Sequence, residues 1–154
     1  MRVVLVAVAV AALRIVLGDL VIVPLATRVW PPPAMPAGTS DIPGHLGHAL
    51  IALLIVWGFA VGEEIGYRGY LLTRTADIGR RSTAAYWMAV LASSTLFGVG
   101  HWYKGPAGVI DSAIAGLLLG SAYMITGRNI WTSILAHGLI DTFAIVVTYL
   151  GLAT

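Results

Sequence analysis

The chain has 154 residues, of which 58% are hydrophobic and 10% are charged, and its formal net charge at pH 7 is +2. A soluble globular domain is about 45–50% apolar with about a quarter of its residues charged, so this composition predicts a membrane protein. The nine cations are scattered, which argues against nucleic acid as a partner, because nucleic acid requires a basic patch or stripe. The lack of cysteine excludes disulfides, a thiol nucleophile and cysteine-ligated metals.

Five apolar segments are long enough to cross a bilayer, which takes about 20 apolar residues. We expect spanning helices at about residues 3–27, 45–73, 83–102, 107–126 and 130–150. Met1-Arg2 and the apolar stretch after it also resemble a signal peptide, but the apolar sequence resumes after Arg14, which favours a retained helix. The predicted fold class is therefore all-α, a multi-pass transmembrane helical bundle in the cell membrane with about five spanning helices.

Turn-forming and cationic residues separate these helices. Pro31-Pro32-Pro33, within residues 28–44, excludes helix and favours an extended connection. Residues 74–82 read as a polar turn, and Lys104-Gly105-Pro106 and Gly127-Arg128-Asn129 mark two further breaks.

Short connections imply antiparallel neighbours, which gives the two sides of the membrane unequal numbers of cations. One side would carry only Arg28 and Lys104. The other would carry five arginines, namely Arg2, Arg74, Arg80, Arg81 and Arg128. By the positive-inside rule, we expect the five-arginine side and the N-terminus to be cytoplasmic.

The densest group of ionisable residues at membrane depth is Glu63-Glu64-Ile65-Gly66-Tyr67-Arg68. An ionised side chain at the bilayer centre costs about 2.5–3.5 kcal/mol on insertion scales, so it should be paired, face water or have a function. Glu64 and Arg68 are four residues apart on one helix face and can form an ion pair. Glu63 points about 100° away and lacks this partner, which makes it a candidate general base. A purely structural ion pair would not explain this second carboxylate.

Two further groups contain histidine. Phe97 and His101 share a face of the third helix, and the glycines between them permit close helix approach. His137 and Asp141 share a face of the fifth helix, where Asp141 can orient the imidazole or help to hold a water. An interfacial histidine and a buried polar pair for helix association are the simpler explanations. The occurrence of all three groups on separate helices, with only seven carboxylates and four histidines in the chain, favours one shared site.

These motifs resemble those of the CAAX protease and bacteriocin-processing (CPBP) family, whose eukaryotic branch contains the type II CAAX prenyl endopeptidases. The pattern is Glu-Glu-x-x-x-Arg, Phe-x-x-x-His and His-x-x-x-Asn/Asp, and here the last position is Asp141. The motifs span residues 63–141, and we divide the chain into an N-terminal transmembrane helix with its proline-rich connection, residues 1–44, and a CPBP-like catalytic helical core, residues 45–154. The chain looks short for this family, so activity could depend on a partner or on homo-oligomerisation.

The resemblance implies an intramembrane endopeptidase that hydrolyses membrane-associated proteins or peptides with an activated water. Glu63 would be the general base, and His101 would help to hold and polarise the water. His137 and Asp141 would lie around the scissile carbonyl, with Asp141 fixing His137, because an ionised Asp141 cannot donate to an oxyanion. The supporting residues would be Glu64, Arg68 and Phe97.

Two alternatives remain open. No cofactor is expected, but Glu63, His101 and His137 could instead bind Zn²⁺ with an open fourth position, which would leave Glu64 as the only base. The protein could also be non-catalytic, as a bacteriocin self-immunity factor or a transporter or assembly subunit that uses buried charges for packing. A protease requires the same three residues at one water-accessible cavity, whereas a packing role requires only local pairs.

The remaining ionisable residues receive simpler interpretations. Asp41, His45 and His48 contain an i, i+3 histidine pair that could ligate a metal, but we expect them to begin the second helix at the interface. Asp111 lies in the first turn of the fourth helix, where the helix dipole favours it. Arg14 and Asp19 are too far apart around the helix to pair with each other.

The depths of the candidate residues disagree if all helices are upright. From the turn at residues 74–82, Glu63 and the pair His137 and Asp141 lie about 12–18 Å into the membrane, but His101 lies about 21–28 Å in. Helix tilt or an interfacial segment over residues 76–85 must absorb this difference.

Overall fold

The computed structural model describes residues 1–31 and 39–152, and these residues form helices and short connections without any β-strand. The all-α prediction is therefore confirmed. Five helical segments within the described residues are long and apolar enough to cross a membrane, and they are Arg2–Ala26, Leu46–Ile78, Thr83–Gly100, Trp102–Ile125 and Ile130–Tyr149. The predicted extended run at Pro32 and Pro33 lies outside the described residues.

The first span is continuous but contains a wider turn in its second half. It consists of α1 (Arg2–Leu17), a π-helical segment η1 (Gly18–Ile22) and α2 (Val23–Ala26). Gly18 opens the π segment, and a Cβ atom there would lie 2.5 Å from Arg14 Nη1. Glycine at this position therefore leaves room for the guanidinium of Arg14 to lie along the helix.

The second span is longer than the sequence predicted. It comprises α3 (Leu46–Glu64), the π-helical segment η3 (Ile65–Leu71) and α4 (Leu72–Ile78), and a 3₁₀ turn η2 (Thr39–Asp41) precedes it. The predicted polar turn at residues 74–82 is thus only four residues long. The helix continues because Leu72 and Ala76 are buried against α5, while the exposed Asp77 pairs with Arg74 and Arg81.

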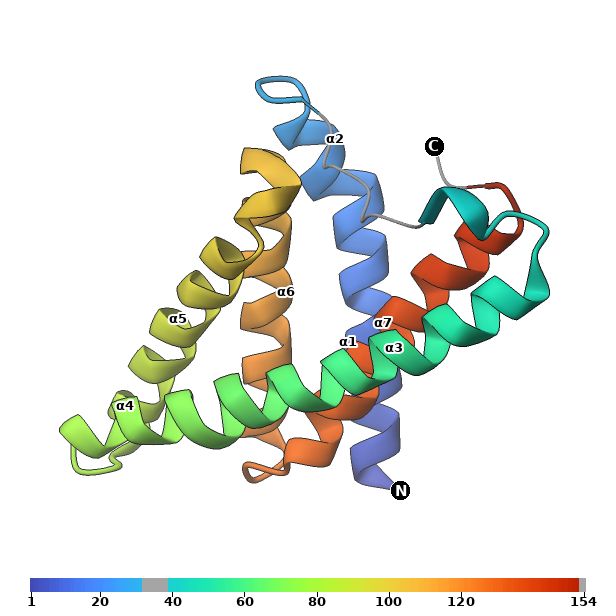
Figure 1. Ribbon diagram of the computed structural model, residues 1–154. Helices are drawn as coiled ribbons and strands as arrows, with labels where there is room; N and C mark the ends of the chain where they lie inside the picture. The colour runs from blue at the N-terminus through green and yellow to red at the C-terminus, as the bar shows by residue number, and fades with distance from the viewer. Residues whose placement is uncertain (32–38, 153–154) are drawn as a thin grey trace.

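This second span has 33 residues, which corresponds to about 50 Å of helix at 1.5 Å per residue. The hydrocarbon core is roughly 30 Å thick, so the helix must tilt strongly. Figure 1 shows α3 running obliquely across the bundle, whereas α6 is nearly upright. Tilt changes the depth at which Glu63 lies, and Glu63 and His101 line one cavity despite the different depths expected for upright helices.

The last three spans agree with the predicted segments to within a few residues. Helix α5 (Thr83–Gly100) begins at Ser82, whose Oγ accepts the Ala85 N–H at 3.2 Å. A 3₁₀ turn, η4 (Trp102–Lys104), follows His101 and leads directly into α6 (Gly105–Ile125). Gly105 has φ of +75°, which reverses the chain at this break. Helix α7 (Ile130–Tyr149) completes the bundle.

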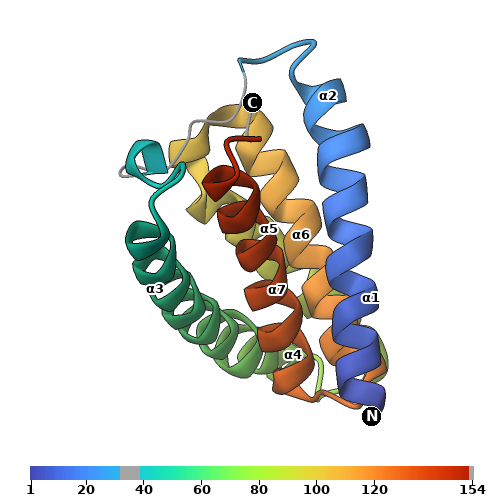
Figure 2. The ribbon, with the colours of Figure 1, turned by 90° about the vertical axis from the view of Figure 1, so that its right-hand side faces the viewer.

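Small residues bring the helices close together. A Cβ atom at Gly98 of α5 would lie 2.6 Å from Cβ of Ala113 in α6, so these two helices pack nearly backbone to backbone. In Figure 2, α7 lies between α3 and α1, and it packs against both. Ala7 and Ala11 of α1 lie in a buried apolar cluster with residues of α6 and α7, namely Leu119, Ala136 and Ile140.

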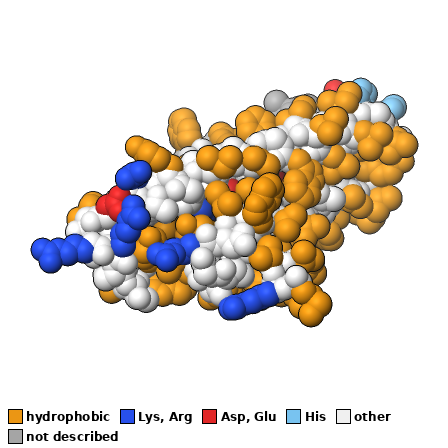
Figure 3. Space-filling view, turned by 90° about the horizontal axis from the view of Figure 1, so that it is seen from below, with side chains coloured by type: hydrophobic (Ala, Val, Ile, Leu, Met, Phe, Trp, Pro, Cys, Tyr) orange, Lys and Arg blue, Asp and Glu red, His pale blue; other side chains and the backbone are white. Residues whose placement is uncertain are grey.

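The two ends of the bundle differ in charge. The N- and C-termini lie at opposite ends, as an odd number of spans requires (Figure 1). The end that carries the N-terminus displays Lys and Arg side chains when viewed along the bundle (Figure 3). Arg2 donates to the carbonyl of Ile125 at 2.7 Å, which ties the start of α1 to the end of α6 there.

Candidate active site

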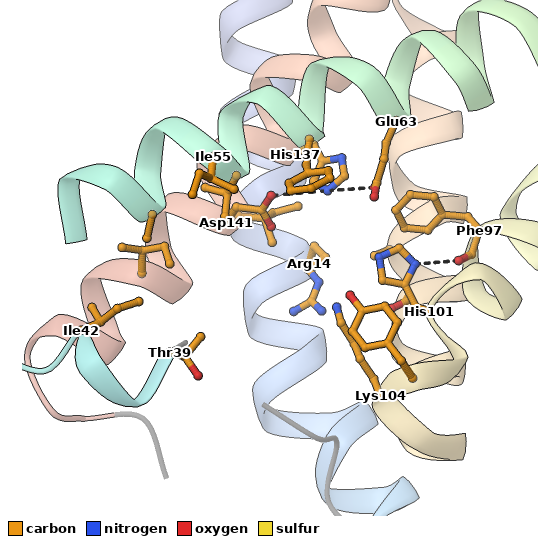
Figure 4. A pocket seen from close by; sticks show the side chains of 18 of the residues that line it. Arg14, Thr39, Ile42, Ile55, Glu63, Phe97, His101, Lys104, His137 and Asp141 are labelled. Carbon is orange, nitrogen blue, oxygen red and sulfur yellow. Dashed lines mark hydrogen bonds and ion pairs between the residues drawn. The ribbon is translucent and has the colours of Figure 1, made fainter. Parts of the chain in front are cut away.

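A cavity of about 740 Å³ lies inside the bundle and is lined by residues from all five spans. Figure 4 shows side chains from these spans around it. All four predicted catalytic residues and Phe97 contribute to its wall, namely Glu63, Phe97, His101, His137 and Asp141. The structure therefore brings together residues that the sequence places up to 78 positions apart, since 141 − 63 = 78.

Glu64 and Arg68 lie behind the cavity wall and form the ion pair that their spacing predicts. Arg68 Nη1 donates to Glu64 Oε1 at 2.7 Å, and the two side chains are only 1% and 0% exposed. Arg68 Nη2 also donates to the carbonyl of Gly116 in α6 at 2.9 Å. Its guanidinium lies 4.8 Å from the centre of the Phe97 ring. Arg68 thus links the second span to both α5 and α6.

Glu64 also holds His137, a contact that the sequence did not indicate. His137 Nδ1 lies 2.9 Å from Glu64 Oε1, and because an ionised carboxylate can only accept, this nitrogen carries the proton. Asp141, which we expected to fix the ring, lies 3.6 Å from the other nitrogen, Nε2. The ring is therefore oriented from the protein interior by Glu64, and Asp141 faces it from the cavity side.

The tautomer of His101 follows from its own partner. His101 Nδ1 lies 2.8 Å from the carbonyl oxygen of Phe97, one turn earlier in the chain, and a carbonyl can only accept. In the neutral ring Nε2 therefore carries a lone pair. The Phe97 ring lies 4.6 Å from the His101 ring and 5.8 Å from the His137 ring, between centroids, so it packs against both imidazoles.

Glu63 is the more accessible of the two adjacent carboxylates in α3. Its side chain is 30% exposed, and Oε2 lies 3.9 Å from His137 Nε2. Its neighbour Glu64 is fully buried, so adjacent positions in α3 place one carboxylate in the cavity and one in the interior. The chain passes into the π segment η3 immediately after Glu64, and such segments are frequent at functional sites.

Trp57 of α3 makes a close contact with the backbone of α7. A Cβ atom at Gly138 would lie 2.6 Å from the Trp57 ring, so the indole packs directly on the backbone of α7. Trp57 Nε1 also donates to Thr142 Oγ1 at 3.1 Å. This contact and the bond from Glu64 to His137 both join the helix that carries Glu63 to the helix that carries His137.

Sequence reasoning missed two cations in the cavity wall. Arg14 forms an ion pair with Asp111, which joins α1 to α6 and accounts for both residues. Lys104 lines the same cavity. The signal for Arg14 was its position in an apolar helix, but its partner is 97 residues away in the sequence. Asp19 is exposed and, as expected, does not pair with Arg14.

The far end of the cavity lies at the start of α3. Asp41 and His48 line it there, and His48 Nδ1 donates to the backbone carbonyl of Asp41 at 2.8 Å. His45 is the residue that precedes α3, in agreement with the expected beginning of a helix at this point.

The ligand set that we considered for zinc does not come together. Within residues 1–31 and 39–152, no three His, Asp or Glu side chains are grouped as metal ligands would be. Glu63, His101 and His137 share the cavity wall, and Nδ1 of each ring is bonded to Phe97 or Glu64, which leaves both Nε2 atoms without a hydrogen bond among the described residues. We therefore derive no chemical step through a metal.

Comparison with known proteins gave one result. A family model described as type II CAAX prenyl endopeptidase Rce1-like matches residues 45–143, which is more than half of the chain. The matched range contains all three motifs and ends just after Asp141. No curated protein and no solved structure matches the chain significantly.

Proposed function

Because this chain belongs to the Rce1-like family of type II CAAX prenyl endopeptidases, we propose that it is an intramembrane endopeptidase in which Glu63 activates a water. The observation that supports this best is the different environment of the two adjacent carboxylates. Glu63 opens onto a cavity together with His101 and His137, whereas Glu64 is buried in an ion pair with Arg68. A role in packing alone would not require an accessible carboxylate beside two histidines.

The nucleophilic water lies between Glu63 and His101 in this proposal. One of its hydrogens is directed to the Glu63 carboxylate and the other to the lone pair on His101 Nε2. As the oxygen attacks the scissile carbonyl, Glu63 takes a proton, and it later delivers that proton to the leaving amine as the C–N bond breaks. The proton that the water loses is the proton that the leaving amine gains, so no further acid or base is needed.

His137 acts on the developing oxyanion. With Nδ1–H bonded to Glu64, the imidazolium form presents Nε2–H to the cavity, where it donates to the oxyanion. Asp141, 3.6 Å from Nε2, stabilises the imidazolium. Glu64 and Arg68 are positioning residues, because they act on the substrate only through His137 and the helix backbone.

The substrate is a membrane-associated peptide or protein. Much of the cavity wall between Glu63 and His48 is formed by apolar residues of α3, which suit a hydrophobic chain. We also propose that the arginine-rich end, with the N-terminus, faces the cytoplasm. All the proposed catalytic groups come from one chain, so the mechanism does not require a homo-oligomer.

The test is cleavage of a peptide library by purified protein reconstituted in lipid. Wild type should release defined products, and Glu63→Gln should reduce the rate by about 10²–10⁴-fold, the usual contribution of a general base. Asp19→Asn removes an exposed carboxylate from another membrane helix and serves as the matched control, with an unchanged rate. Equal rates for wild type and Glu63→Gln would favour the non-catalytic alternative.

A further inference from the structure

Five arginines lie at the end of the bundle that carries the N-terminus, although they are far apart in the sequence. They are all exposed, and they are Arg2, Arg74, Arg80, Arg81 and Arg128. Figure 3 views this end and shows Lys and Arg side chains spread across it. Asp77 is the only acidic residue here in the described part of the chain, so five positive charges face one negative charge.

Two turns of this arginine-rich end present their cations around the same residue, Tyr86. The Arg128 guanidinium lies 4.7 Å from the centre of the Tyr86 ring. Tyr86 is also within electrostatic range of Arg81. Arg81 bonds to Asp77 through Nε at 2.5 Å, and neither of its Nη groups has a hydrogen bond among the described residues. The turn after α4 and the turn before α7 therefore offer unused guanidinium donors close to each other.

Three of these arginines adopt an unfavourable backbone conformation. Arg80, Arg81 and Arg128 have φ of +54°, +54° and +64°. Within residues 1–31 and 39–152, no other residue except glycine has a positive φ. A residue with a Cβ atom is disfavoured in this conformation, where glycine or asparagine is usual. Arginine closes these turns at a cost that glycine would avoid, which indicates a use for the charged side chains.

Apolar and aromatic side chains lie among the cations. Ile78, the last residue of α4, is 87% exposed, and Tyr70 and Trp131 are 65% and 62% exposed. The Arg74 guanidinium lies 5.9 Å from the centre of the Tyr70 ring. The second span is longer than the hydrocarbon core is thick, so its polar last turns reach the lipid headgroups. Exposed cations beside exposed aromatic and aliphatic side chains are typical of contact with a membrane surface.

From this surface we propose that the arginine-rich end binds the phosphate headgroup of an anionic phospholipid, with Arg80, Arg81 and Arg128 as donors. Guanidinium groups bind phosphate through paired N–H donors. The net negative charge of a lipid such as phosphatidylglycerol is attracted by the excess of cations, whereas zwitterionic phosphatidylcholine carries no net charge. The headgroup lies between the turns after α4 and before α7. It thus holds together the ends of the second and fifth spans, which Glu64 and His137 join in the interior.

Lipid competition tests the proposal directly. Purified protein in detergent is offered phosphatidylglycerol and phosphatidylcholine with the same acyl chains, and bound lipid is counted by mass spectrometry of the intact protein. Wild type should prefer phosphatidylglycerol. Arg80→Gln combined with Arg128→Gln should reduce the preference by about fivefold for each arginine, which is the usual contribution of a cation near the membrane surface. Arg28→Gln removes an exposed cation from the other end of the bundle and is the matched control.

The backbone conformation provides a second readout, which a purely structural role of Arg80 would not produce. Arg80→Gly relieves the left-handed conformation and removes the charge. In phosphatidylcholine this variant should therefore unfold at the same temperature as wild type or a higher one. Its unfolding temperature should rise less than that of wild type when phosphatidylglycerol is added.

Three results would overturn the proposal. Wild type could retain the two lipids equally, or the preference could survive in the doubly substituted protein. Inorganic phosphate that displaces phosphatidylglycerol at equal concentration would assign the surface to a soluble anion instead. None of these measurements requires turnover, so they decide the lipid site separately from the proposed protease activity.

Discussion

Glu64 Oε1 accepts hydrogen bonds from both Arg68 Nη1 at 2.7 Å and His137 Nδ1 at 2.9 Å, so one buried oxygen joins the second span to the fifth. The i, i+4 ion pair therefore also holds a proposed catalytic imidazole across the bundle.

This relationship predicts a catalytic phenotype for Glu64→Gln. Replacing charge-assisted hydrogen bonds, worth about 1.5–3 kcal/mol, by weaker bonds to an amide oxygen should reduce kcat by roughly 10- to 100-fold while KM changes little, because His137 is held less firmly. Thermal stability should fall as well, because Arg68 loses its buried counter-ion. Asp77→Asn is the control, since Asp77 is also paired with arginines but is exposed and remote from the cavity. Steady-state kinetics of both variants decide the matter, and an unchanged kcat in Glu64→Gln would remove Glu64 from the mechanism.

Arg68→Ala should mainly affect stability. It leaves the buried Glu64 with His137 as its one remaining partner and removes the donor to the Gly116 carbonyl, so we expect a loss of about 3–5 kcal/mol. Folded yield and thermal unfolding in detergent measure this loss. Arg74→Ala, which breaks an exposed ion pair, should change stability by about 1 kcal/mol or less. Normal stability in Arg68→Ala would instead identify Arg68 as a substrate contact.

Chelators should leave the activity intact. Glu63 and His101 suffice to activate water in the proposed mechanism, and using Glu63 as a ligand would leave only the buried, ion-paired Glu64 as a base. Cleavage rates in EDTA, together with elemental analysis of the purified protein, measure this. Loss of activity in EDTA that added Zn²⁺ restores would recast Glu63 as a ligand.

Gly138→Ala should displace α3. The added Cβ atom would overlap the Trp57 ring, and such overpacking typically costs about 1–3 kcal/mol. Because α3 carries both glutamates, activity should fall together with thermal stability. Gly58→Ala places the same methyl group on α3 where nothing lies within 4 Å, so it should be neutral or slightly stabilising. Similar behaviour of the two variants would show that the Trp57 contact does not position the helix.

The orientation in the membrane can be tested with single cysteines, because the chain has none. Ser40→Cys and Thr83→Cys place exposed thiols at opposite ends of the bundle. With a cytoplasmic N-terminus, a membrane-impermeant maleimide should label Ser40→Cys in intact cells and Thr83→Cys only after permeabilisation. The reverse pattern would place the arginine-rich end outside.

The sequence predicted contacts within one helix better than contacts between helices. The pairing of Glu64 with Arg68 follows from their spacing of four residues and the regular geometry of a helix. The bond from Glu64 to His137 depends on how the second and fifth spans cross, and no spacing encodes that. The same holds for Arg14 and Asp111, which received separate explanations although they form one ion pair.

Helix ends were predicted least well where polar residues continue a helix. Residues 74–78 looked like a turn because they are polar, but an exposed helix surface tolerates Arg74 and Asp77 while Ala76 packs inward. The π segments η1, which begins at Gly18, and η3, which contains Arg68, were not predicted either. Tertiary contacts set these features.

The tilted α3 gives the cavity an unusual boundary. Ile51, Ile55 and Phe59 line the cavity, yet each is more than half exposed, so the inner wall of the site is also an outer surface of the protein. Under the proposed function, an opening at this depth would let a substrate anchored in the bilayer meet the enzyme by diffusion in two dimensions. The quantity that governs encounter is then the number of substrate molecules per unit area of membrane. Dilution with lipid, and not with buffer, should then slow the proposed reaction.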